Sequence, residues 1–158
     1  MTEPIRRDIV VDAGADRAFE VFTAGMTGWW RPEHHIGETP IAEIVIEPRP
    51  GGRWFTRHED GSETDTGVVR AWEPPHRLVV TWQISSQWRF DADLVTTVEV
   101  RFVAEGPDRT RVELEHRDLD GFGPDAADMR ETFDAPDAWT ETLAGFAAAL
   151  APAGEPQR

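Results

Sequence analysis

Residues 97–117 read TVEVRFVAEGPDRTRVELEHR, and this stretch decides the fold. Apolar and charged residues alternate along both halves, and the Gly106-Pro107-Asp108 string between them is typical of a turn. The second half places Val112, Leu114 and His116 on one face and only charged residues on the other. One wet face and one dry face indicate an antiparallel hairpin, within a sheet that is covered on a single side.

The same period of two continues towards the amino terminus. Turn signals at 50–52, 60–61 and 74–75, rich in Gly and Pro, separate the apolar alternating runs. Together with the hairpin, the pattern predicts seven strands, the others at 5–11, 42–46, 53–58, 63–72 and 77–83. A loop over 84–93 precedes the hairpin.

Two helical segments are expected between the first two strands. The apolar residues of 15–22 recur at helical spacing, and Gly25 ends that run. Met26, Trp29 and Trp30 indicate a further short helical turn.

A final helix must cover the dry face of the sheet. The stripe that predicts it, along about four turns, consists of Trp139, Leu143, Phe146 and Leu150. Asp134 is the expected N-cap and Pro136 falls in the first turn, where proline is tolerated. A shorter helical segment over 124–133 precedes it. Helices on one side of an antiparallel sheet define the α+β class.

The chain is strongly acidic, because thirty Asp and Glu residues face sixteen Arg and no Lys, for a formal charge of −14. A surface of this sign repels phosphate backbones and anionic lipid, so we expect neither nucleic-acid nor membrane partners. There are no cysteines, which excludes disulfides and thiolate metal sites. No signal peptide is evident and no apolar run approaches the roughly 20 residues that cross a bilayer, so a cytoplasmic location is expected.

The length of 158 residues matches one domain. We expect it to span residues 1–150, followed by a flexible tail at 151–158. Asn and Tyr are absent along with Lys. Because these residues have AT-rich codons, we hypothesise a GC-rich bacterial genome.

Seven tryptophans exceed what the core of a small domain requires. By alternation, Trp54, Trp82 and His116 lie on the concave face of the sheet. Trp30 precedes the first long connection, near one mouth, and Trp88 lies in the loop that could cover it. The expected ligand-binding residues are Trp30, Trp54, Trp82, Trp88, His116 and Trp139, the walls and polar anchor of a cavity for an apolar ligand. The alternative is that these rings simply fill the core.

Few residues suggest catalysis or metal binding. His116 is either a satisfied core side chain or, in an open cavity, a ligand donor or proton shuttle near neutral pH. The neighbours His34 and His35 cannot easily aim at one ion, which favours a solvated loop. All three serines fall in turns or loops, without a nucleophile elbow, and nucleotide-binding motifs are absent. We therefore expect no metal and no cofactor, and assign no catalytic residue.

Four strings, in this order and spacing, carry a resemblance to a known family. They are residues 13–30 with paired tryptophans, RPGGRW at 49–54, PPHRLVVTW at 74–82 and TRVELEH at 110–116. The chain resembles the START-like (SRPBCC, helix-grip) superfamily over about residues 5–150. Within it, the chain is similar to the family named after the activator of heat-shock protein 90 ATPase.

The resemblance implies a curved seven-stranded antiparallel sheet wrapped around a long C-terminal helix, with a hydrophobic cavity between them. Many relatives bind lipids, sterols, polyketides or other apolar molecules, and a few catalyse cyclisation. The activator proper also has an amino-terminal domain that engages the chaperone, for which we expect no room in this chain. The final helix of relatives often starts with Gly-Trp, whereas Asp137-Ala138-Trp139 stands here.

Three functions follow as hypotheses. The first is binding of an apolar small molecule, such as a lipid, polyketide or aromatic metabolite, without catalysis. The second is a partner-binding module that acts on a chaperone of the heat-shock protein 90 class. The third is an enzyme of the cyclase or hydratase type that uses His116. In each case we expect a monomer or a homodimer.

Overall fold

The computed structural model describes residues 2–30 and 39–150. Its strands are β1 (Ile5–Val11), β2 (Ile41–Ile46), β3 (Arg53–His58), β4 (Glu63–Glu73), β5 (Arg77–Trp82), β6 (Thr96–Gly106) and β7 (Arg109–Arg117). They form one seven-stranded antiparallel sheet in the order β1-β7-β6-β5-β4-β3-β2. Consecutive strands from β2 to β7 are therefore neighbours in the sheet, and β1 pairs with β7 at one edge. The predicted sheet is confirmed.

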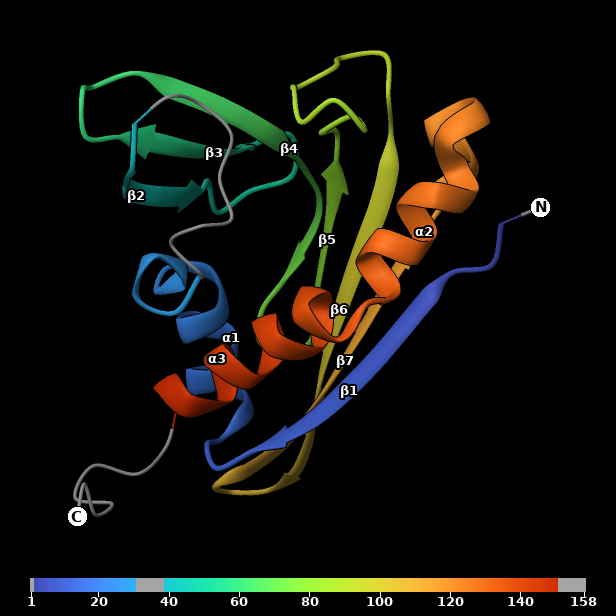
Figure 1. Ribbon diagram of the computed structural model, residues 1–158. Coiled ribbons are helices and arrows are strands. Elements are labelled where there is room, and N and C mark those ends of the chain that lie inside the picture. The colour runs from blue at the N-terminus through green and yellow to red at the C-terminus, as the bar shows by residue number, and fades with distance from the viewer. Residues whose placement is uncertain (1, 31–38, 151–158) are drawn as a thin grey trace.

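The sheet curves because its register shifts at several points. Shifts occur between β2 and β3, between β3 and β4, and between β4 and β5, and such bulges bend and twist a sheet locally. At the second of them Gly67 faces Trp54, and a Cβ on Gly67 would collide with the carbonyl oxygen of Thr81. Figure 1 shows the sheet curving around the helices, with β2–β3 and β1 on opposite sides.

Two short helical segments follow β1, as predicted. Helix α1 (Ala15–Thr23) buries Ala18, Phe19 and Phe22, and Met26–Gly28 forms a 3-10 turn. The apolar stripe of α1 thus faces the sheet.

The carboxyl-terminal helical region differs from the prediction. Helix α2 (Ala126–Asp134) is followed by a π-helical turn, Pro136–Thr140, and then by α3 (Glu141–Ala149). The predicted N-cap is wrong, because Asp134 is the last residue of α2. The residue before a proline avoids the helical region, and Ala135 accordingly has an extended backbone (φ −65°, ψ 149°). The stripe itself is confirmed: Trp139, Leu143, Phe146 and Leu150 are all buried.

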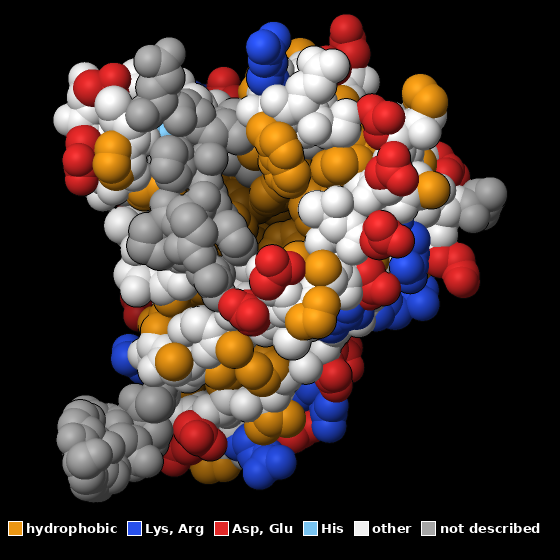
Figure 2. All heavy atoms as spheres, viewed as in Figure 1, with side chains coloured by type: hydrophobic (Ala, Val, Ile, Leu, Met, Phe, Trp, Pro, Cys, Tyr) orange, Lys and Arg blue, Asp and Glu red, His pale blue; other side chains and the backbone are white. Residues whose placement is uncertain are grey.

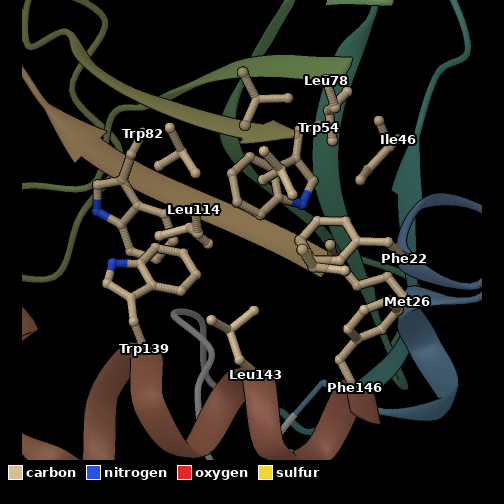
Figure 3. Packing of buried hydrophobic residues seen from close by; sticks show 14 of the residues in the cluster. Phe22, Met26, Ile46, Trp54, Leu78, Trp82, Leu114, Trp139, Leu143 and Phe146 are labelled. Atoms are coloured by element: carbon tan, nitrogen blue, oxygen red, sulfur yellow. The ribbon is translucent and has the colours of Figure 1, made fainter. Parts of the chain in front are cut away.

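The core lies between the concave face of the sheet and the helices. Phe146 of α3 packs its ring 5.1 Å from that of Phe22 and 5.2 Å from that of Trp29, and Figure 3 shows α3 residues reaching towards the sheet. Within 2–30 and 39–150, no helix is long and apolar enough to cross a membrane. His34, His35 and the predicted tail at 151–158 lie outside the described residues.

Candidate ligand site

Four of the predicted tryptophans meet in space and form a closed cycle, which we call the tryptophan ring. Ring centroids lie 6.2 Å apart for Trp30 and Trp54, and 5.7 Å apart for Trp54 and Trp82. Trp139 completes the cycle at 6.1 Å from Trp82 and 6.4 Å from Trp30. All four pairs are edge-to-face, which aromatic rings prefer.

Different elements supply these side chains. Trp54 and Trp82 come from β3 and β5, Trp139 comes from the π-helical turn, and Trp30 follows the 3-10 turn. Trp54, Trp82 and Trp139 are buried, whereas Trp30 is half-buried. Figure 3 shows Trp139 pointing from the helix towards the indoles of the sheet.

A hollow is visible on this side of the molecule. Figure 2 shows it floored by hydrophobic side chains (orange), in front of β5, below the loop that follows β5 and to the left of α2. The floor is apolar, and acidic side chains stand near the hollow. This is the character of a site for an apolar small molecule.

His116 lies beside the ring and is fully buried. Its Nδ1 accepts a hydrogen bond of 3.2 Å from Nε1 of Trp139, and its Nε2 lies 2.9 Å from Oγ1 of Thr96. The indole nitrogen can only donate, so Nδ1 is unprotonated and the proton of the neutral ring sits on Nε2. Oγ1 of Thr96 in turn donates to the carbonyl oxygen of Trp82. The hydrogen-bond chain therefore fixes the tautomer of His116 and the orientation of Trp139.

Burial lowers the pKa of His116 to about 3, because a charged imidazolium loses its hydration there. The ring is therefore neutral near pH 7, and both nitrogens are used within the protein. This arrangement matches the core interpretation of His116 and gives no support to a proton shuttle.

The indole of Trp82 has an unused donor. Its Nε1 is buried without a hydrogen-bond partner among the described residues, in contrast to Trp29, whose Nε1 donates to the carbonyl oxygen of Val21 at 2.8 Å. An unsatisfied buried polar group costs about 1–3 kcal/mol. Figure 3 shows the nitrogens of Trp82 and Trp139 on the same side of the cluster.

Trp88 stands apart from the other predicted residues. It is 50% exposed and its backbone is left-handed (φ 60°). Among the described aromatic pairs, none joins Trp88 to the tryptophan ring. The structure therefore places five of the six predicted site residues together and leaves Trp88 on the surface.

Two neighbours of the site were missed from the sequence. Phe133, near the end of α2, packs its ring 4.7 Å from that of His116 and 5.6 Å from that of Trp82. Its place in a short helix with four charged residues among nine gave little signal.

Arg7 is the other missed residue. It faces the helices because it pairs with Leu114 across the sheet, and it interrupts the apolar alternation of β1. Its Nη2 donates to Oδ1 of Asp134 at 2.6 Å, and its Nε donates to Oγ1 of Thr140 at 3.0 Å. Arg7 thereby ties both ends of the turn that carries Trp139 to the sheet.

The chemistry of the site is apolar. Across the described part of the chain, no three His, Asp or Glu side chains come together to hold a metal ion. The site can offer aromatic faces and one indole donor.

Comparison with known proteins places the chain in a family. The model of the family described as Activator of Hsp90 ATPase homolog 1-like protein matches residues 12–151. No protein with a curated description matches the chain.

Three solved structures illustrate the range of similar proteins. The anthrahydroquino-γ-pyrone synthase Txn09, solved with a ligand, is 38% identical (TM-score 0.66, covering 92% of this chain and 95% of that one). The self-sacrificing resistance protein CalC from Micromonospora echinospora is 29% identical (TM-score 0.70, 94% of both chains). PFC0360w, an HSP90 activator from Plasmodium falciparum, shares the fold at 17% identity (TM-score 0.51, 72% of this chain and 71% of that one). The chain belongs to the Activator of Hsp90 ATPase homolog 1-like family and has its helix-grip fold.

Proposed function

We propose that this protein binds a flat, uncharged, polycyclic aromatic molecule against the tryptophan ring. The observation that carries the proposal is the closed cycle of four indoles, in which the Nε1–H of Trp82 has no acceptor among residues 2–30 and 39–150. The 38% identity to an anthrahydroquino-γ-pyrone synthase supports the same ligand class.

The lining selects against charge. The ring residues, Phe133 and the neutral His116 carry no charge, and burying an unpaired ion among them would be strongly unfavourable. Indole faces and edges instead suit a planar aromatic ligand.

One polar group on the ligand is expected. A ligand that binds against the indole of Trp82 would bring a carbonyl or hydroxyl oxygen to its Nε1. The hydrogen bond would then satisfy the donor that the protein leaves unused, which contributes about 1 kcal/mol.

The substitution Trp82→Phe tests this contact, because it keeps an aromatic ring and removes the N–H. For 1,8-dihydroxyanthraquinone, which carries oxygens, we expect affinity to fall about fivefold in a fluorescence titration. For anthracene, which has no acceptor, we expect a much smaller change.

Trp88→Phe is the matched control and should leave both affinities unchanged, since Trp88 lies on the surface. Failure of a broad set of planar aromatics to bind, or to raise the melting temperature, would refute the proposed function. Equal losses for both ligands would refute the assigned role of the Trp82 donor.

A second candidate is ring closure of a bound polyketide, favoured by the synthase among the similar structures. Because His116 is neutral and fully hydrogen-bonded, the chain would act by holding the substrate in a reactive geometry and excluding water. Mass spectrometry of aromatic polyketide substrates incubated with the protein would detect a cyclised product. Binding without formation of a cyclised product would eliminate this second candidate and retain the first proposal.

Chaperone binding is a third candidate, and it rests on the name of the family. Addition of this protein to a heat-shock protein 90 chaperone would then stimulate ATP hydrolysis. Unchanged hydrolysis at high protein concentration would eliminate it.

A further inference from the structure

A second groove lies between α1, β2 and the turn after β4, and shares no lining residue with the tryptophan ring. Its volume is about 440 Å³, within the usual range of small-molecule sites. Its apolar lining includes Phe19, Ile44, Ile46, Trp72, Pro74 and Pro75. Phe19 and Trp72 pack edge-to-face with centroids 5.0 Å apart, so the aromatic floor is built by α1 and β4 together.

Every charged residue that lines this groove is acidic. Asp16 and Glu20 come from α1, Glu43 comes from β2, and no arginine is among the lining residues. Glu43 pairs with Arg57, whereas no described arginine forms an ion pair with Asp16 or Glu20. The rim therefore carries unneutralised negative charge beside an apolar floor.

The spacing of the two α1 carboxylates is unfavourable for the helix alone. Like charges four residues apart destabilise a helix by about 0.2–0.5 kcal/mol. Asp16 is explained by the helix dipole, since it lies in the first turn. Glu20 lies beyond that turn, so the helix dipole does not offset its repulsion from Asp16.

We propose that this groove binds a small organic cation, an ammonium group carried on an apolar body. The ammonium would lie at the rim beside Glu20 and Asp16, and the hydrocarbon part would cover Phe19 and Trp72. Trp72 is half-buried, and an ammonium group over the face of its ring would gain a further attraction from the π-electrons. This is a second site, independent of the ligand proposed for the tryptophan ring.

Three probes of equal chain length separate charge from apolar contact: n-octylammonium, n-octanol and n-octanoate. By calorimetry, octylammonium should bind at least about fivefold more tightly than octanol, and octanoate most weakly. Raising the salt concentration should weaken octylammonium only, because exposed charges are screened. Equal affinity for octylammonium and octanol would overturn the proposal.

Glu20→Gln locates the cation. It should lower octylammonium affinity about threefold to fivefold and leave octanol unchanged, whereas Glu131→Gln, on the exposed surface of α2, should change neither. Octylammonium should also shift the indole N–H resonance of Trp72. Its affinity should not change in the Trp82→Phe variant. Normal octylammonium affinity in Glu20→Gln would refute the site, whatever the outcome at the tryptophan ring.

Discussion

At the residue scale, His116 is fully buried beside the tryptophan ring and fixes the orientation of Trp139. It joins Trp139 to Thr96, and Thr96 to the backbone of β5 at Trp82. Each ring nitrogen of His116 has one hydrogen-bond partner. A side chain that replaces His116 must therefore satisfy two buried polar groups. A buried histidine of this kind acts as a positioning residue for the neighbouring tryptophan.

His116→Ala should lower the free energy of unfolding by about 3 kcal/mol, through a cavity and two unsatisfied polar groups. The pH dependence identifies the cause. The pKa of His116 is about 3 in the folded state and 6.5 in its ordinary state. Below pH 6.5 the unfolded chain therefore binds a proton that the folded protein does not bind. The free energy of unfolding is thus highest above pH 6.5 and decreases as the pH falls. Between pH 6.5 and 5 we expect the wild type to lose about 1–2 kcal/mol and the variant to lose less.

Urea unfolding at several pH values measures both effects. His76→Ala, at an exposed histidine, is the control and should change stability by less than about 0.5 kcal/mol. A His116→Ala protein with the wild-type slope between pH 6.5 and 5 would show that His116 is not the group that titrates.

At the scale of elements, the outer face of the sheet is held by an ionic network across β5, β6 and β7. Glu99 of β6 accepts hydrogen bonds from Arg77 (2.8 Å), Arg101 (2.7 Å) and Arg117 (2.6 Å). Its side chain is only 7% exposed, although the alternation places it on the wet face. Burial by itself would raise its pKa, but the three guanidinium groups outweigh it and lower the pKa to about 2.

Glu99→Gln should lower the free energy of unfolding at pH 7 by about 3 kcal/mol, because three arginines lose their shared carboxylate. The folded pKa is depressed, so this stability is present above pH 4.5 and is lost as pH falls towards 2. Chemical denaturation should show that the difference in free energy of unfolding between wild type and variant decreases over that pH range. Glu113→Gln, exposed on the same face, should have little effect, and an equal loss there would contradict the network.

At the scale of the whole molecule, α3 connects α1 to the sheet. Phe146 is fully buried against Phe22 and Trp29, while Trp139 at the other end of this region packs on Trp82. The two ends of one apolar stripe thus have different partners, since one end packs against α1 and the other belongs to the tryptophan ring. We therefore expect stability and the proposed binding to be altered by different substitutions.

Phe146→Ala should lower the free energy of unfolding by about 3–5 kcal/mol. The same substitution at Phe90, which is 38% exposed, should have a much smaller effect. Calorimetric unfolding compares the two variants. Similar losses of stability in both would mean that the packing of α3 against α1 contributes little to the stability of the fold.

The sequence by itself determined the sheet and its dry face. Alternation along β6 and β7 and the stripe from Trp139 to Leu150 depend only on local periodicity, so they predicted which residues are buried. Alternation also placed Trp54, Trp82 and His116 on one face. The same periodicities and turn signals gave the order of elements, and the resemblance to the family added the expectation of a cavity between sheet and helix.

Only the tertiary structure decided which side chains meet. It separated Trp88 from the tryptophan ring, brought in Phe133 and Arg7, ended α2 at Asp134, and buried Glu99 beneath three arginines. These outcomes depend on contacts between residues far apart in the chain, such as Arg7 with Asp134, whose energies overrule local preference. Periodicity reports the face on which a residue lies, whereas hydrogen-bond partners and neighbouring rings are set by packing in three dimensions.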